Sequence, residues 1–92
     1  MAACMGQISC NLSVGPFSGE VVFYIQTDAG PYSGLAPKHY ASSSKPLLRT
    51  PIPGKLRVKI LRNGGGQAVV QVPDGEALTV SADLVKTLAQ IR

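Results

Sequence analysis

The chain has 92 residues, a formal net charge of +4 and a hydrophobic content of 45 %, which suits one small globular domain. Its isoelectric point near 9.4 permits an anionic partner, but the dense lysine and arginine clusters of dedicated nucleic-acid binders are missing. Frequent valine, 10 glycines and 7 prolines, without a long run of helical periodicity, favour an all-β fold.

Residues 1–15 have few charges and no regular period, so we predict a disordered or loosely docked tail. This tail contains the only two cysteines, Cys4 and Cys10. Without a nearby histidine they cannot supply the four ligands of a structural zinc site. We expect two thiols in a mobile segment, with a disulfide between them as the alternative in an oxidising compartment.

The same segment lacks the basic start and the unbroken apolar run of a secretory signal. No apolar stretch elsewhere reaches the roughly 18 residues that span a bilayer. We therefore expect a cytoplasmic protein without a membrane partner.

The single domain is predicted to cover residues 16–92, and its first strand is expected over Gly19 to Thr27. Alternate positions of that strand form one face with Val21, Phe23 and Ile25 and a second face with Val22, Tyr24 and Gln26. Because both faces are largely apolar, the strand is expected to be covered on both sides.

Residues 28–53 are predicted to form a long loop, because they carry five of the seven prolines and show no sustained period. We expect residues 31–40 to be an ordered excursion that packs on the barrel, and residues 42–46 to be flexible. The alternative is a short extra strand around residues 47–50.

Three further strands are predicted between Gly54 and Val80, because apolar residues alternate there as in half-buried strands. These residues are Leu56, Val58 and Ile60, then Ala68, Val70 and Val72, then Leu78 and Val80. Turns separate the strands at residues 63–66 (Asn-Gly-Gly-Gly) and 73–75 (Pro-Asp-Gly), since Gly and Asn accept positive φ and Pro presets a turn.

The last segment has two interpretations. Ser81 is a candidate N-cap and Asp83 would follow it in a first helical turn. Apolar residues then recur at helical spacing, at Leu84, Val85, Leu88 and Ile91, which favours a short C-terminal helix. The alternative is a 3₁₀ turn over residues 82–84 followed by a last strand through Val85, Thr87, Ala89 and Ile91.

The order strand, turn, strand, Asp-Gly turn, strand, followed by Val-Ser-Ala-Asp-Leu-Val at residues 80–85, resembles the C-terminal half of SH3-like small β-barrels. In that family a V/I-P-S-x-Y/L-V segment makes a 3₁₀ turn before the final strand, and here Ser81 stands in place of the proline. The resemblance covers roughly residues 54–85. It implies an SH3-like small barrel of about five strands, which we predict with a short C-terminal helical element.

The peptide-binding activity of signalling SH3 domains is not carried over, because the chain has no tryptophan. Catalytic residue types are also scarce. His39 is the only histidine, and neither a Gly-x-Ser-x-Gly elbow nor a matched carboxylate pair accompanies it. The glycines at 64–66 belong to a hairpin tip rather than a phosphate loop, and five dispersed acids do not make a metal site. We expect no enzymatic activity, no cofactor and no metal.

One predicted strand carries a basic row, which consists of Lys55, Arg57 and Lys59 with Arg62 just beyond. Alternate strand residues project to one side about 6.5–7 Å apart, so the row could follow the phosphates of a polyanion. The ordinary explanation is a solvated face whose cations also hinder edge-to-edge aggregation. Single-strand binders interleave aromatic rings for base stacking, and this strand has none. Nucleic-acid or polyanion binding is therefore the second hypothesis, in which Tyr24 would supply a ring if it lay beside the row.

The first hypothesis concerns a surface in the long loop, formed by Tyr32, Leu35, His39 and Tyr40. Loops on a rigid scaffold concentrate binding residues, and tyrosine offers contact area with one polar end. The alternative is that the tyrosines only anchor their own loop. This hypothesis describes a non-enzymatic protein-interaction module whose partner binds the loop and the adjacent barrel face.

Overall fold

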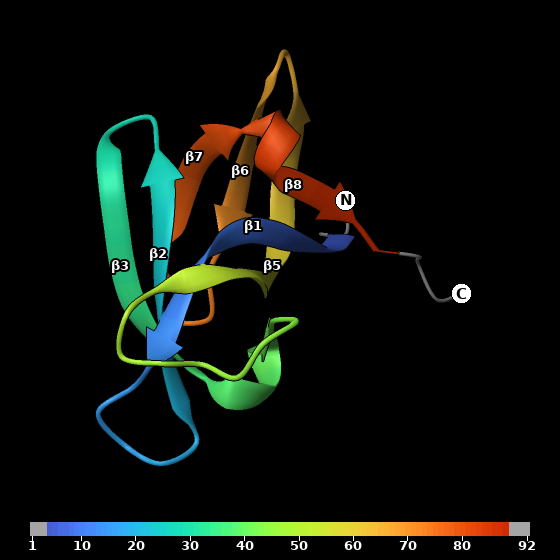
Figure 1. Cartoon of the computed structure of the whole chain (residues 1–92). Helices are drawn as coiled ribbons and strands as arrows, with labels where there is room; N and C mark the ends of the chain where they lie inside the picture. The colour runs from blue at the N-terminus through green and yellow to red at the C-terminus, as the bar shows by residue number, and fades with distance from the viewer. Residues whose placement is uncertain (1–3, 89–92) are drawn as a thin grey trace.

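The computed structural model describes residues 4–88, which form one curled antiparallel β-sheet with two 3₁₀ turns (Figure 1). The elements are β1 (Cys4–Val14), β2 (Glu20–Thr27), β3 (Gly30–Pro37), η1 (Lys38–Tyr40), β4 (Ala41–Ser42), β5 (Ile52–Gly64), β6 (Gln67–Gln71), β7 (Ala77–Ser81), η2 (Ala82–Leu84) and β8 (Val85–Thr87). The all-β prediction is confirmed, although this part of the chain has eight strands rather than about five. Their order is β3-β2-β1-β5-β6-β7, with β4 paired to β5 and β8 paired to β1.

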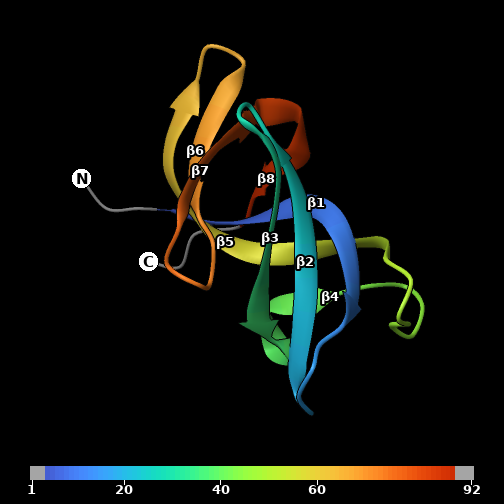
Figure 2. The same cartoon turned by 90° about the vertical axis from the view of Figure 1, so that its left-hand side faces the viewer.

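Strand β5 is long enough to serve two partners. Its first part pairs with β1 over Ile52–Ile60, and its last part pairs with β6 over Lys59–Gly64. Figure 2 shows β5 crossing behind the β2–β3 hairpin and then turning to run beside β6 of the β6–β7 hairpin. The predicted apolar faces are confirmed as the buried core: Val21, Phe23 and Ile25; Leu56, Val58 and Ile60; Ala68, Val70 and Val72; Leu78 and Val80.

Strand β1 occupies the middle of the sheet, so the prediction of a disordered or loosely docked tail is wrong for residues 4–14. It pairs with β5 on one side, and β8 and β2 share its other side. The inward positions of β1 are Gly6, Ile8, Cys10 and Leu12. Two of these four side chains are small, so the sequence shows no clear apolar alternation.

Residues 30–37 form strand β3, so the prediction of a long loop is wrong over this range. The strand pairs with β2 along its whole length and lies at one end of the sheet. Pro31 and Pro37 are tolerated there because an edge strand does not need every amide hydrogen, and these prolines concealed the strand. The expected ordering of residues 31–40 is confirmed, whereas the alternative strand at residues 47–50 is absent.

Both predicted glycine turns are confirmed. Gly65 and Gly66 have φ angles of 65° and 82°, which is the conformation that a tight two-residue hairpin loop demands. In the β6–β7 turn, Gly75 has a φ of 98°. There the backbone N–H of Glu76 donates a hydrogen bond to Asp74 Oδ1 at 3.0 Å, so the Asp side chain supports its own turn.

The C-terminal segment takes the alternative form, because the 3₁₀ turn η2 is followed by strand β8. The C-terminal α-helix is not confirmed, and Ser81 makes no side-chain cap hydrogen bond. The backbone N–H of Leu88 donates to the carbonyl of Met5 at 3.1 Å, which continues the contact between β8 and β1. Ala89 and Ile91 of these predictions lie outside the described residues.

The two cysteines lie six positions apart on β1, about 20 Å at 3.3–3.4 Å per residue. No disulfide joins Cys4 and Cys10, and a disulfide could not bridge that separation. The expectation of a mobile segment and the alternative disulfide are therefore both wrong. Burial raises the pKa of Cys10 to about 12, so its thiol stays protonated at neutral pH.

Gly6 is expected to resist substitution, because β1 passes very close to its neighbours there. A Cβ atom at this position would lie 2.5 Å from Ile60 Cδ1 and 2.9 Å from the carbonyl oxygen of Lys86. We expect Gly6→Ala to lower the free energy of unfolding in urea by about 1–3 kcal/mol. The matched control is Gly64→Ala, whose Cβ would meet no atom within 4 Å and should change stability by less than about 0.5 kcal/mol. Equal effects of the two substitutions would contradict this placement of β1.

Candidate functional site

The basic row predicted on β5 faces outward. Lys55, Arg57 and Lys59 are exposed, whereas the intervening Leu56 and Val58 are buried. The alternation predicted from the sequence is confirmed for this strand. Strand β5 lies inside the sheet, with β1 on one side and β4 and β6 on the other.

A β-bulge keeps Arg62 on the outward side of β5. Strict alternation would turn Arg62 inward, because it lies two positions after the buried Ile60. The register with β6 shifts between these two residues, so Arg62 is opposite the partly buried Val69. Leu61 is the extra residue of the bulge, and 47 % of its surface is exposed. A bulge re-aims side chains in this way, and no local residue pattern announced it.

A further cation reaches the row from β8. Gln7 of β1 is opposite Arg57 on one side and opposite Lys86 on the other. Directly opposed residues of neighbouring strands point to the same face, so Lys86 lies about 10 Å from Arg57, two strand spacings away. Sequence reasoning missed Lys86 because its position depends on the pairing of β1 with β8.

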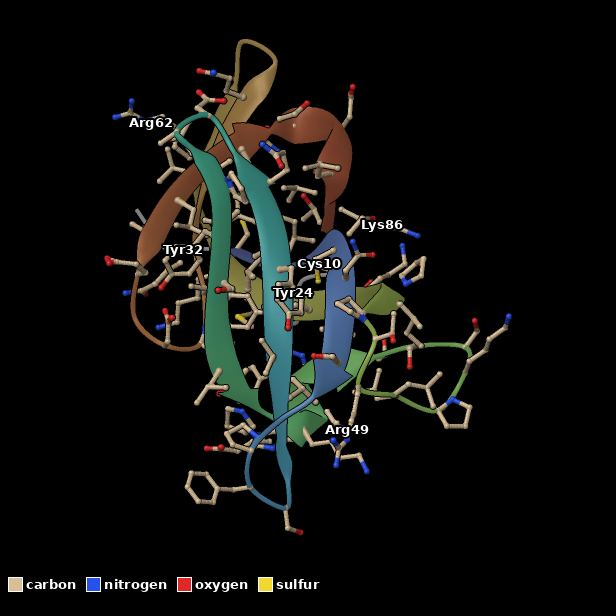
Figure 3. All side chains as sticks on the ribbon, turned by 60° about the vertical axis from the view of Figure 1, so that its left-hand side comes forward. Cys10, Tyr24, Tyr32, Arg49, Arg62 and Lys86 are labelled. Carbon is tan, nitrogen blue, oxygen red and sulfur yellow. The ribbon has the colours of Figure 1, made fainter. Side chains whose placement is uncertain are left out.

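We refer to Lys55, Arg57, Lys59 and Lys86 as the cationic face. Arg62 is not part of this set: it also lies on the outward side of β5, but Figure 3 shows Arg62 and Lys86 on opposite sides of the molecule. The structure therefore brings together three of the four residues predicted for a polyanion site and adds one that was not predicted.

None of the five carboxylates of the chain lies on the strands that carry the cationic face. Glu20 begins β2, Asp28 is in the β2–β3 turn, Asp74 and Glu76 are in the β6–β7 turn, and Asp83 is in η2. The positive charges are thus not neutralised by acidic neighbours on β1, β5 or β8. A face of one sign attracts counter-ions and charged ligands, over a Debye length of about 8 Å at physiological ionic strength.

Uncharged side chains fill the spaces between the cations. The outward residues of β1 opposite Lys59, Arg57 and Lys55 are Met5, Gln7 and Ser9 respectively. Two tyrosines flank this area. Tyr24 shares the outward face because it is opposite Asn11 of β1, and Tyr40 lines a shallow cleft of about 280 Å³ together with Arg57 and Lys59. Aromatic rings therefore border the row, although none lies on β5 itself.

The four residues predicted on the 31–40 segment do not form one surface. Tyr32 and Leu35 lie on opposite faces of β3, because residues three apart on a strand point to opposite sides. Leu35 is 42 % exposed, whereas Tyr32 packs against the core. His39 and Tyr40 belong to η1, and their ring centroids are 4.6 Å apart.

A cleft of about 550 Å³ lies between the β1–β2 turn, η1 and the loop that follows β4. Phe17 at this cleft is 71 % exposed. Glu20 also lines it, and within residues 4–88 the Oε1 atom of Glu20 is buried without a hydrogen-bond partner. This cleft contains none of the residues that the sequence suggested for a site.

Comparisons with protein-family models, curated proteins and solved structures found no match to this chain. The geometry of the molecule is therefore the basis for a functional proposal. In the described part of the chain, no three His, Cys, Asp or Glu side chains gather closely enough to hold a metal ion. Over the same residues, no helix has the length and apolar character needed to cross a bilayer.

Tyr32 helps to close the curl of the sheet. Its hydroxyl donates a hydrogen bond to Asp74 Oδ2 at 2.6 Å, which joins β3 to the β6–β7 turn. Nearby, the backbone N–H of Asp28 donates to the carbonyl of Thr79 at 3.0 Å. The hydrogen bond to Asp74, together with burial and the charges of Asp74 and Glu76, raises the pKa of Tyr32 to about 12.

The role of Tyr32 can be measured from its ionisation. Because its folded-state pKa lies above the ordinary value of 10.0, its hydrogen bond stabilises the fold below pH 10 and is lost as the pH rises through 12. We expect Tyr32→Phe to lower the free energy of unfolding by up to about 1 kcal/mol at neutral pH, with the difference shrinking towards pH 12. Ultraviolet titration should also show one late-ionising phenol that is missing from the variant. Identical titrations of the two proteins would contradict this assignment.

Proposed function

We propose that this chain is a non-catalytic binding module whose cationic face binds the phosphate backbone of nucleic acid, single strands above all. One observation carries the proposal. The pairing of β1 with both β5 and β8 gathers Lys55, Arg57, Lys59 and Lys86 on strands that carry none of the five carboxylates. Phosphate oxygens form charge-assisted hydrogen bonds with such cations, and these contacts supply most of the sequence-independent affinity for nucleic acid.

The ordinary explanation of the row fits this fold less well. Cations on a strand often protect an open sheet edge, but β5 has partners on both sides. A solvated protein surface typically mixes charges of both signs, whereas the cationic face carries positive charges alone. This distribution supports a role for the cations beyond solubility.

Two aromatic rings support single strands as the preferred form of nucleic acid. Tyr24 and Tyr40 flank the cationic face, and exposed ring faces can stack on unpaired bases. Tyr24 is exposed, whereas Tyr40 is half-buried and packs against the core, so Tyr24 offers the larger stacking surface. Paired bases in a duplex do not offer their faces to such rings. The hydroxyl of Tyr24 lies 3.2 Å from the hydroxyl of Ser13, which holds the ring in place at the rim.

The protein-interaction hypothesis ranks second. Its supporting observation is the exposed apolar side chain of Leu35 on β3. The other three residues of the predicted surface lie on different faces or elements, so a partner would not contact them together through one patch. The absence of enzymatic activity stays a prediction.

We also propose that the fold is a variant of the SH3-like small barrel. Five strands support this assignment, because the β5–β6–β7 meander is followed by the 3₁₀ turn η2, and β8 then pairs with β1. The remaining strands β2, β3 and β4 all lie between β1 and β5 in the chain. In a five-strand barrel made of β1, β5, β6, β7 and β8, they would form one long, elaborated connection between the first and second strands.

Titration of a fluorescent single-stranded oligonucleotide of random sequence tests the binding proposal. We expect log K to fall with log[salt] by about 0.7 for each phosphate contact. Simultaneous replacement of Lys55, Arg57 and Lys59 by Gln should abolish binding at physiological salt, because the row would lose all of its charge. Lys86→Gln alone should reduce the slope by about 0.7.

The matched control is Lys38→Gln, which removes the same charge beside the large cleft instead of on the cationic face. It should change the affinity and the slope far less than Lys86→Gln. Absence of binding even at low salt would overturn the proposal. Equal losses from Lys38→Gln and Lys86→Gln would also overturn it, because the attraction would then depend on net charge alone.

A further inference from the structure

A recess of about 400 Å³ lies at one end of the cationic face, beside Lys55. Four of its eight lining residues are serines, which come from β1, from β4 and from the loop that follows β4. These residues are Ser9, Ser42, Ser43 and Ser44. The recess therefore combines one ammonium group with several hydroxyls, and none of its lining residues is acidic.

The sheet register places three of these groups in a line. Lys55 of β5 is opposite Ser9 on β1 and opposite Ser42 on β4, so the three side chains point to the same face. Neighbouring strands are about 4.7–4.9 Å apart, which sets one hydroxyl on each side of the lysine. This arrangement follows from backbone pairing and does not depend on the conformation of any long side chain.

Three hydroxyls of the recess are available to a ligand. Within residues 4–88, Ser9, Ser42 and Ser44 make no side-chain hydrogen bond to other protein groups. Ser43 is already engaged, because its Oγ donates to the carbonyl of Lys45 at 2.6 Å and so folds the loop back on itself. Three hydroxyl donors and one ammonium group are thus free to bind oxygen atoms.

Gly54 keeps the floor of the recess compact. A Cβ atom there would lie 2.8 Å from the carbonyl oxygen of Ser42 and would collide with the side chain of Leu12. Only glycine lets β4 approach β5 closely enough to bring Ser42 beside Lys55. Cys10 also lines the recess, and because burial raises the pKa of its thiol to about 12, it adds no negative charge.

We propose that this recess binds a terminal phosphate, the phosphate monoester at the end of an oligonucleotide whose backbone follows the cationic face. The proposal rests on the function proposed above. Lys55 is the last cation of the row, and the next outward position of β5 is the uncharged Pro53. The row of cations that would contact the oligonucleotide backbone therefore ends at Lys55. A monoester carries nearly two negative charges at neutral pH and three oxygen acceptors, which suits one ammonium flanked by hydroxyls better than a singly charged diester does.

The experiment compares one single-stranded oligonucleotide in three forms, with a 5′-phosphate, with a 3′-phosphate and without a terminal phosphate. We expect one phosphorylated form to bind about tenfold more tightly than the form without phosphate, as for one added charge-assisted contact. The preference should decline below about pH 6, where the monoester dianion takes up one proton and becomes a monoanion. The polarity of the preferred end gives the direction of the strand on the cationic face.

Serine variants separate the recess from the rest of the face. In the double variant Ser9→Ala/Ser42→Ala, the ratio of the affinity for the preferred phosphorylated strand to the affinity for the unphosphorylated strand should fall towards one. Ser33→Ala removes an exposed hydroxyl on β3, outside the recess, and should leave the ratio unchanged. Inorganic phosphate, added as a competitor, should diminish the preference before it displaces the unphosphorylated strand.

The possible failures are distinct. Equal binding of all three oligonucleotides would overturn the terminal-phosphate site and leave the backbone-binding proposal standing. No binding of any oligonucleotide would overturn both. If inorganic phosphate shifts the amide resonances of Ser9 and Ser42 while no oligonucleotide binds, the site recognises free phosphate and its assignment to an oligonucleotide end is wrong.

Discussion

Strand β1 must pair with three other strands, and the rest of the sheet depends on this requirement. β5 covers one side of it, whereas β8 and β2 divide the other side between them. Such crowding requires an inward position without a side chain, and Gly6 provides it where Ile60 and the backbone of β8 approach. The curl of the sheet and the proximity of Lys86 to Arg57 are both consequences of this central strand.

The acidic and the basic side chains of the molecule have different roles. The acids near the closing seam are engaged in structure, because Asp74 accepts hydrogen bonds from Tyr32 and from the backbone of Glu76, and Asp28 accepts one from the side chain of Gln67. The basic residues of β5 and β8 instead project from the outer surface of the sheet. This separation leaves a surface with a net attraction for anions on a protein of modest total charge.

Local patterns in the sequence were sufficient for the strands whose inward residues are all apolar, as in β2, β5, β6 and β7. They failed at β1, where Gly6 and Cys10 interrupt the apolar period, and at β3, where prolines are compatible only with an edge position. The residues of the candidate site also differ in whether a local pattern predicts them. Lys55, Arg57 and Lys59 follow from alternation within one strand, whereas Lys86 and the pairing of Ser9 with Lys55 depend on contacts between distant segments. The sequence predicts Tyr32 and Leu35 as neighbours in a loop, but a strand points them in opposite directions.

Within residues 4–88 no strand pairs with the outer side of β3, and its two prolines limit the pairing that this border of the sheet permits. A strand from a second molecule that added there would find no amide hydrogen at Pro31 or Pro37, so the usable stretch is confined to residues 32–36. Growth of the sheet from one molecule to the next is thereby discouraged. The same prolines that concealed β3 in the sequence act as a barrier against fibre formation.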